Sequence, residues 1–438
     1  HIHVAGDHTG VDFFVPVGVF LGYTEYDSYS GSMSSDLGME LKVADWIVIG
    51  VHLALTITVG VVVSLTNKTK DKMTAGRSMN GLIIGLSMLS GLCSGISYIG
   101  VPGYAVSDGV GVMFLFLGFF LVIPVGSAII IPFYHRLQLT TAYEYLSLRF
   151  SKKIRIIASF LFILRIVLYL GVVLYAPALI LQSSIGIPLY ASILFTGVCA
   201  TLWTLKGGMV AVIYTDAVQS IAMLIGVLVC IGITISKVDG GLGGIFTALT
   251  NRSTIEHNYV PWADLAAFHP TQTSNPSESF WALLFGAGMN SLVQSTTDQL
   301  AVQRFMTAKS LYECIKSFIF TGLLNALIVF LLGFEGVTIL GYYLTHGDFK
   351  PPLLNGNITS TDHLLPFYAL TVLPAGVAGL LLAAVVGSTM SVYSGGINAA
   401  ATAMHIDVLS YLCHKQTGER GSAAERRRLM ILTIVFSW

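Results

Sequence analysis

Nine apolar runs, each long enough to cross a lipid bilayer, constrain this chain more than any other feature of its sequence. A membrane-spanning helix needs about 20 mostly apolar residues, because the hydrocarbon core is about 30 Å thick. The runs occupy residues 45–66, 80–106, 110–135, 155–182, 188–205, 208–236, 279–303, 316–345 and 374–412, and a tenth begins near residue 429. Only 11% of the 438 residues are charged, against roughly 25% in soluble domains. The sequence therefore predicts an all-α polytopic protein of the lipid bilayer.

Composition and the absence of known motifs limit the function classes. The formal net charge is zero, which gives no reason to expect a nucleic-acid partner. The five cysteines lie in apolar segments without CxxC spacing, so neither a disulfide framework nor a metal cluster is predicted. The sequence contains no HExxH, nucleophile elbow or phosphate-binding P-loop, so we expect neither an enzyme nor an organic cofactor. No protein partner can be inferred.

The distribution of Lys and Arg predicts the orientation of the chain. Alternate loops hold 18 of the 23 basic residues, and the positive-inside rule places these loops in the cytoplasm. The N-terminus would then lie outside the cell, with the chain in the plasma membrane. The two largest loops on the opposite side contain sequons at Asn251 and Asn357, which are predicted glycosylation sites.

Both ends of the chain differ from ordinary spanning segments. Residues 1–42 are expected to form an extracellular extension that is disordered or non-native, since the apolar run at 11–23 is too short to span. Met33 and Met39 precede the first spanning segment and are candidate native start residues. The final residues, RLMILTIVFSW, begin an apolar segment and stop after a few turns, so we expect a truncated C-terminus. The transmembrane domain is assigned to residues 43–438.

Two apolar stretches carry residues that break helices. The middle of 80–111 contains Gly91, Ser94, Gly95, Ser97, Gly100, Pro102 and Gly103, and 280–303 contains Gly286, Gly288, Asn290 and Ser291. A break inside the membrane frees backbone carbonyls and a helix N-terminus, which can face a cation and an anionic group. The alternative is that small residues allow close helix packing. The two stretches predict two repeats of opposite topology, the first at about 80–236 and the second from about 279.

The long segment 374–413 carries a stripe of small and polar residues. Its members, Ser388, Ser391, Ser394, Gly395 and Asn398, cover about one third of a helix circumference, whereas Leu381, Val385 and Val392 point elsewhere. A hard monovalent cation needs several oxygen ligands, and hydroxyl groups together with carbonyls of a broken helix would supply them. Alternatively, the Ser and Gly residues allow tight packing and the hydroxyls bond to the preceding turn.

Charged residues inside predicted spans are functional candidates, because burying them in a membrane is costly. Asp216 would attract a cation that leaves toward the cytoplasm, or would form a structural pair with a Lys or Arg. Asp298 is expected to pair with Arg304 near the inner surface. Arg165 would either bind a substrate carboxylate or neutralise Asp216.

Several motifs resemble those of the sodium/solute symporter family. The run KGGMVAVIYTDAVQ at 206–219 is similar to its GG-x-x-AV-x-x-TD-x-x-Q signature. TAYEYLSLRF at 141–150 and TDQLAVQR at 297–304 resemble two further family segments. VVLYAPALIL, which ends at Leu181, resembles the subgroup of sodium-coupled monocarboxylate, multivitamin and iodide transporters. The resemblance implies the inverted-repeat fold of the bacterial leucine transporter with one extra N-terminal helix, here with an incomplete second repeat.

The resemblance also implies a site. The family's Na⁺ site would use backbone oxygens near Ser94 and Ser97, the oxygen of Ser388 and the hydroxyl of Ser391, with Asp216 matching an aspartate associated with Na⁺ release. Val392 replaces a Ser or Thr of the family, which removes one ligand unless Ser394 or a water compensates. Candidate substrate-binding residues are Arg165, Asn290, Ser394 and Asn398. Where Arg165 lies, related carriers have an uncharged polar residue, so it favours a carboxylate substrate.

The sequence thus predicts sodium-coupled secondary active symport across the plasma membrane by alternating access. The expected substrate is a small anionic solute, namely a monocarboxylate, a vitamin carboxylate or an iodide-like anion, with Na⁺ as the coupling ion. Two alternatives stay open. One is a choline, proline or sugar carrier, and the other is a non-transporting sodium-dependent receptor or leak.

Overall fold

The computed structural model describes most of the membrane region. The described residues are 41–67, 69, 71, 73–107, 110–185, 188–250, 280–346, 353–354, 357–358, 364–410 and 423–437. Most of the predicted extension at 1–42, together with Met33, Met39 and the sequon at Asn251, therefore lies outside the described residues. Asn357 lies in the short strand β2.

The described chain is almost entirely helical, as the apolar runs predict. Its α-helices are α2 (Val43–Thr66), α3 (Gly81–Leu92), α4 (Gly95–Ser107), α5 (Leu117–Val125), α6 (Ile131–Leu137), α7 (Glu144–Arg149), α8 (Lys152–Ile185), α9 (Leu189–Lys237), α10 (Gly241–Thr250), α11 (Phe280–Thr297), α12 (Gln299–Phe305), α13 (Leu311–His346), α14 (Leu364–Thr371), α15 (Val377–Ala403) and α17 (Ala423–Ser437). Short 3-10 or π segments are η3 (Ala75–Arg77), η4 (Val110–Phe116), η5 (Gly126–Ile130) and η10 (Met404–Leu409). Two-residue strands, β1 (Leu353–Leu354) and β2 (Asn357–Ile358), pair antiparallel.

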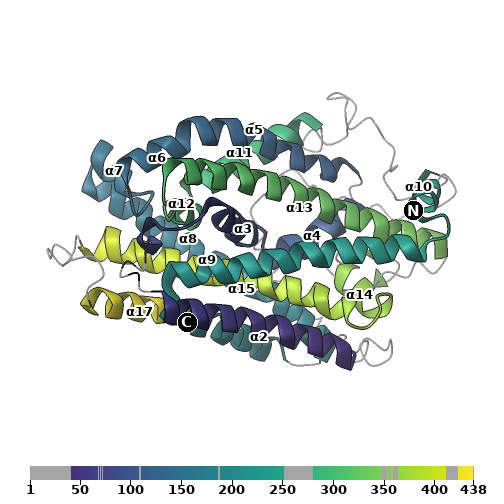
Figure 1. The fold of residues 1–438 in the computed structure, drawn as a ribbon. Coiled ribbons are helices and arrows are strands. Elements are labelled where there is room, and N and C mark those ends of the chain that lie inside the picture. The colour runs from purple at the N-terminus through teal and green to yellow at the C-terminus, as the bar shows by residue number, and fades with distance from the viewer. Residues whose placement is uncertain are drawn as a thin grey trace.

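Figure 1 shows the long helices side by side in one bundle, with α3 at its centre. Helix α15 packs against α9, α8 and α2, whereas α13 packs against α3 and α4. Six described helices are long and apolar enough to cross a membrane, and the bent pair α3 and α4 would make a seventh span. The other two predicted spans, 188–205 and 279–303, coincide with the first part of α9 and with α11 and α12.

The predicted break in the first stretch is present. Helices α3 and α4 meet at Cys93 and Ser94 with a bend of 66°. A second break lies within α9, where Gly208 has φ 59° and ψ −162°, a conformation that a residue with a Cβ rarely adopts. The helical backbone is thus interrupted at both places, between α3 and α4 and within α9.

The break expected at Gly286, Gly288, Asn290 and Ser291 is not there, because α11 runs through these residues. The helix instead stops before Asp298, whose side chain accepts a hydrogen bond from the Leu300 amide (3.0 Å) and caps α12. Gly288 has a packing role. A Cβ on Gly118 of α5 would lie 2.6 Å from the Gly288 nitrogen, so the two backbones are in close contact.

Two polar anchors fix the ends of the central helices. Asp45 of α2 accepts hydrogen bonds from the amides of Gly376 and Gly379 (both 2.7 Å), which ties α2 to the start of α15. Glu313 of α13 accepts a bond from the Gly81 amide (2.7 Å) at the start of α3. Each carboxylate satisfies amides that a helix N-terminus leaves without partners.

Candidate cation and substrate site

The break between α3 and α4 lies directly against α15. A Cβ on Gly95 would be 2.3 Å from Thr389 Oγ1 and 3.0 Å from the Val385 carbonyl oxygen. Only glycine therefore permits this approach. Ser388 lies between Val385 and Thr389 in the sequence of α15, so the break lies beside the N-terminal end of the polar stripe.

Ser94 and Ser97 stand at the start of α4, and Ser94 is 2% exposed. The Ser97 amide donates to Ser94 Oγ (3.4 Å), and the Ser94 carbonyl accepts from the Tyr98 amide (3.0 Å). One C-terminal carbonyl of α3, that of Leu89, accepts from the Cys93 amide (2.9 Å). The last turn of α3 has no following helical turn to satisfy its carbonyls, which makes them available to a ligand.

A buried ion pair packs against α3 at Ser87, one to two helical turns before the break between α3 and α4. Arg304 of α12 and Asp216 of α9 are both 0% exposed, and the guanidinium donates to Asp216 Oδ2 (2.9 Å). The same guanidinium donates to Ser87 Oγ (3.0 Å) and to the Leu300 carbonyl (2.9 Å), and Ser87 donates to Asp216 Oδ2 (2.8 Å). Asp216 Oδ1 has no hydrogen-bond partner among the described residues. One carboxylate oxygen is therefore left for a further ligand.

Two glycines make room for this guanidinium. A Cβ on Gly91 of α3 would lie 3.0 Å from Arg304 Cζ, and a Cβ on Gly395 of α15 would lie 2.3 Å from its Nη2. Gly395 was predicted only as part of the polar stripe, and the structure gives it this packing role.

Hydroxyl groups join the ion pair to α15. Ser90 Oγ lies 2.8 Å from Ser391 Oγ and 3.0 Å from the Asp216 carbonyl oxygen, to which it donates. The Ser90 amide donates to Ser220 Oγ (3.1 Å) on α9. Ser391 and Asp216, both predicted site residues, are thus connected through Ser90 at the meeting point of α3, α9 and α15.

The partners of the charged residues differ from those expected. Asp298 does not pair with Arg304, and Arg165 does not neutralise Asp216. Arg165 of α8 instead forms an ion pair with Asp298, while Arg304 takes Asp216. The Arg165 side chain is 50% exposed and also lies over the Phe162 ring at 5.6 Å. The pairing leaves part of the Arg165 guanidinium accessible.

Of the remaining predicted site residues, three lie on α15 and one lies apart on α11. Ser388 and Ser394 donate back to carbonyls of their own helix, at Val385 (2.9 Å) and Ser391 (3.1 Å), as the packing alternative predicts. Asn398 faces the Met209 sulfur of α9 (3.2 Å). Asn290 is exposed on α11 and accepts from Gln294 (3.3 Å), so the structure does not bring it to the other site residues.

Val392 does not point into this group of hydroxyls. Its side chain is 1% exposed and belongs to an apolar cluster with Ile166 and Leu170 of α8. A residue at this position contacts the α8 side of α15, whereas Ser391 faces α3. In this structure Val392 therefore serves packing.

Three members of the site, Ser87, Ser90 and Thr389, were not predicted from the sequence, and a fourth, Arg304, was expected to pair with Asp298. Thr389 Oγ1 is buried without a hydrogen-bond partner among the described residues, directly against Gly95. A helical spacing of three between Ser87, Ser90 and the break was the available signal for the first two. No group of three or more His, Cys, Asp or Glu side chains suited to a metal occurs in the described part of the chain. The oxygens offered here are hydroxyls, carbonyls and one carboxylate, a set suited to a monovalent cation rather than to a transition metal.

A broken helix, packed against a hydroxyl-bearing helix within an all-helical bundle, is the architecture of membrane carriers. Residues 73–438 match the model of the family described as "Sodium:solute symporter family". The chain belongs to this family, and the predictions of family and fold class are confirmed.

Two curated relatives and one solved structure illustrate the similarity. The human sodium/iodide cotransporter is 32% identical over 83% of this chain and 55% of its own length. The zebrafish sodium-coupled monocarboxylate transporter 2 is 28% identical over 84% of this chain and 58% of its own length. A solved structure of a Na⁺-coupled sialic acid symporter in a substrate-bound outward-open state superimposes with a TM-score of 0.79, at 25% identity, over 90% of this chain and 80% of that chain.

These relatives are transporters, so the prediction that the chain is not an enzyme is confirmed. The chain spans little more than half the length of the curated relatives that it matches.

Proposed function

We propose that the protein containing this chain performs sodium-coupled symport of a small anionic solute across the plasma membrane. The observation that carries the proposal is the close approach of Gly95, at the start of α4, to Val385 and Thr389 on either side of Ser388 in α15, together with the hydroxyl pair of Ser90 and Ser391. The names of the relatives support Na⁺ as the coupling ion and a small solute as cargo.

In this proposal Na⁺ binds among the backbone oxygens near Ser94 and Ser97, the oxygen of Ser388 and the hydroxyl of Ser391. The free Oδ1 of Asp216 supports its assignment as the acid that receives the ion on its way to the cytoplasm. Na⁺ binding favours an outward-open state, the solute then allows closure, and rocking of one helix group against the other opens the site inward. A potential of 100 mV supplies about 2.3 kcal/mol for each charge that crosses.

Arg165 is the candidate that selects an anionic solute, with Ser394, Asn398 and Asn290 as further substrate candidates. Its half-exposed guanidinium can present donors to a carboxylate while one nitrogen holds Asp298. The orientation with the N-terminus outside, and glycosylation at Asn251 and Asn357, remain predictions from the sequence.

Uptake into proteoliposomes tests the proposal directly. The full-length protein is expected to accumulate a labelled short monocarboxylate, biotin or iodide under an inward Na⁺ gradient but not under K⁺. Ser391→Ala is expected to raise the Na⁺ concentration for half-maximal uptake by about tenfold to about 150-fold, since a lost oxygen ligand of a charged group costs about 1.5–3 kcal/mol. Ser64→Ala, on the extra helix α2, is the control that keeps the wild-type value.

Three outcomes would count against this proposal. Solute binding without accumulation under either gradient would favour a receptor or leak. An unchanged Na⁺ dependence of Ser391→Ala would reject Ser391 as a ligand, and selective accumulation of choline, proline or a sugar would replace the anionic solute.

Arg165→Gln tests the choice of solute. This variant is expected to weaken the apparent affinity for carboxylates about tenfold, because the amide cannot make a charge-assisted bond, and to leave iodide-like ions largely unaffected. Competition by both classes against one labelled solute measures the difference. Arg149→Gln, at the end of α7, is the matched charge control. Equal losses for both classes would assign Arg165 to the Asp298 ion pair alone.

A further inference from the structure

Glu335 of α13 is a buried acid that the proposed transport mechanism does not use. Its side chain is 0% exposed, and apart from the weakly donating thiol of Cys230 neither carboxylate oxygen has a hydrogen-bond partner among the described residues. It lies inside the longest apolar helix that can span the membrane, Leu311–His346. An ionisable group at such a position is costly and calls for a function.

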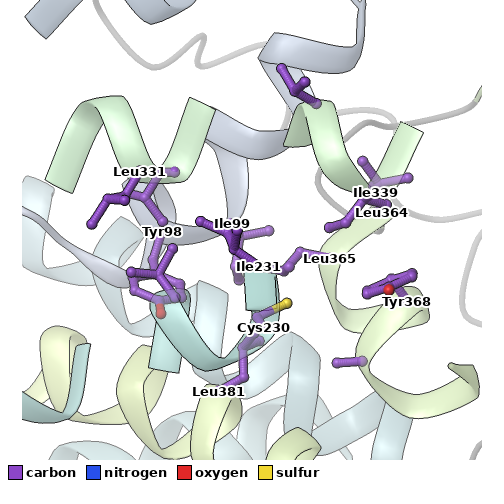
Figure 2. Close-up of a cluster of buried hydrophobic side chains, with 14 of the residues drawn as sticks. Tyr98, Ile99, Cys230, Ile231, Leu331, Ile339, Leu364, Leu365, Tyr368 and Leu381 are labelled. Atoms are coloured by element: carbon purple, nitrogen blue, oxygen red, sulfur yellow. The ribbon is translucent and has the colours of Figure 1, made fainter. Parts of the chain in front are cut away.

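The surroundings of Glu335 are apolar. Leu331 and Ile339, one turn before and after it on α13, belong to the largest apolar cluster among the described residues. Figure 2 shows Leu331 beside Tyr98 of α4 and Ile339 beside Leu364, with Cys230 of α9 between the two groups. Because residues four apart lie on the same helix face, the Glu335 side chain enters this cluster.

Close backbone packing leaves little room beside Glu335. A Cβ on Gly336 would lie 2.2 Å from the Pro102 carbonyl oxygen, so α13 and α4 touch at the next residue. The backbone of α4 therefore forms one wall near this acid.

Neighbouring titratable groups offer no positive charge. Cys230 on α9 and Tyr98 on α4 face Glu335. The Tyr98 hydroxyl donates to the Met223 carbonyl (3.1 Å), and Tyr98 in turn faces Cys93. Tyr368 on α14 lies beyond Cys230, and its hydroxyl donates to Thr234 (2.8 Å). No Lys, Arg or His is among the groups that act on Glu335 in the described part of the chain.

We propose that Glu335 is a proton-binding site of the membrane bundle, separate from the cation site of α3, α4 and α15. A Na⁺ ion needs several oxygen ligands, whereas the closely packed surroundings of Glu335 offer one carboxyl beside a thiol and a phenol. A bare carboxylate without a partner is strongly disfavoured in such surroundings. A proton is the one cation that satisfies the group without further ligands.

Glu335 is connected to the break between α3 and α4 through Tyr98. The Tyr98 amide donates to the Ser94 carbonyl (3.0 Å), so Tyr98, which faces Glu335, lies one turn after the proposed Na⁺ ligand Ser94. Release of the proton would place a charge against α4 and alter its packing on α13. Proton occupancy of Glu335 thereby regulates the element that carries the break.

Infrared spectroscopy of the purified full-length protein tests the proposal without any transport assay. The wild-type protein at about pH 7 is expected to show the carbonyl stretch of a protonated carboxylic acid, with the shift that deuterium exchange produces. Glu335→Gln keeps the shape of the side chain but cannot ionise, and it is expected to lose this component of the band. Glu313→Gln is the matched control on the same helix, because Glu313 already has Lys309, Lys316 and the Gly81 amide as partners.

A second variant and a second measurement keep the proposal open to contradiction if Glu335→Gln does not fold. Glu335→Asp is expected to shift the band in frequency instead of removing it. Thermal unfolding of the wild-type protein is expected to occur at a lower temperature as the pH is raised, because release of the proton leaves a buried charge without a cationic partner. Glu335→Gln is expected to lose this pH dependence of the unfolding temperature, and Glu313→Gln is expected to keep it. Spectra of wild type, Glu335→Gln and Glu335→Asp that coincide would overturn the proposal, whatever the outcome of the uptake assay.

Discussion

Arg304→Met is expected to destabilise the folded protein by about 3–5 kcal/mol, because it leaves Asp216 as a buried charge without a partner. The guanidinium makes bonds to Asp216, Ser87 and Leu300 at once, and both members of the ion pair are 0% exposed. Methionine fills much of the same volume, so the loss reports on charge and hydrogen bonding more than on a cavity. Chemical unfolding of the purified full-length protein in detergent measures the change.

A double-mutant cycle separates the ion pair from packing. Asp216→Asn combined with Arg304→Met removes both charges, and it is expected to be less destabilised than the sum of the single variants. Lys316→Met is the control, because its contact with Glu313 is 3.9 Å long and Glu313 keeps Lys309 and the Gly81 amide as partners; a weak pair of this kind contributes about 0–1 kcal/mol. Strictly additive single variants would contradict a buried, mutually dependent pair.

The helices were predictable from the sequence because their signals are local. Apolar runs of spanning length located α2, α13 and α15, and a run with Gly and Pro at its centre located the break between α3 and α4. The polar stripe of α15 was also predictable, since helical periodicity alone places Ser388, Ser391 and Gly395 on one side.

The partners of the charges were not predictable in the same way. Asp216 and Arg304 are 88 residues apart, and Arg165 and Asp298 are 133 apart, so their pairing depends on how whole helices pack. Sequence distance favoured Asp298 with Arg304 on neighbouring turns. In the fold Asp298 pairs with Arg165 of α8, whereas Arg304 pairs with Asp216 of α9. Asp298 caps the start of α12, and Arg304 lies near the end of that short helix, so the two side chains leave it in different directions.

Glycine illustrates the same limit. Gly95 and Gly288 both occur in apolar stretches with other small residues, yet only the first stretch is broken there. At Gly288 the absence of a side chain permits contact with Gly118 of α5. The true interruption, at Asp298, had a local signal that glycine obscured: an Asp that begins a short helix is a common N-cap.

Gly95→Ala is expected to reduce Na⁺-dependent uptake by the full-length protein more than about tenfold, because the added methyl group separates the two elements of the proposed cation site. Its Cβ would lie 2.3 Å from Thr389 Oγ1 and 3.0 Å from the Val385 carbonyl, and overpacking of this kind costs about 1–3 kcal/mol. Uptake at saturating and at limiting Na⁺ distinguishes a weakened site from a lower amount of folded carrier, which fluorescence-detected size exclusion measures independently.

A matched control and a compensating change decide whether the approach of α4 to α15 is responsible. Gly171→Ala introduces the same methyl group on α8, where nothing lies within 4 Å, so it is expected to transport normally. Thr389→Ala removes the hydroxyl nearest to the new methyl group, so combining it with Gly95→Ala is expected to restore part of the uptake and of the Na⁺ affinity. The backbone carbonyl of Val385 cannot be removed in this way, which is why full recovery is not expected. Normal Na⁺ dependence of Gly95→Ala alone would show that the cation does not bind between these two helices, because a site built from Ser94 and Ser388 cannot survive their separation unchanged.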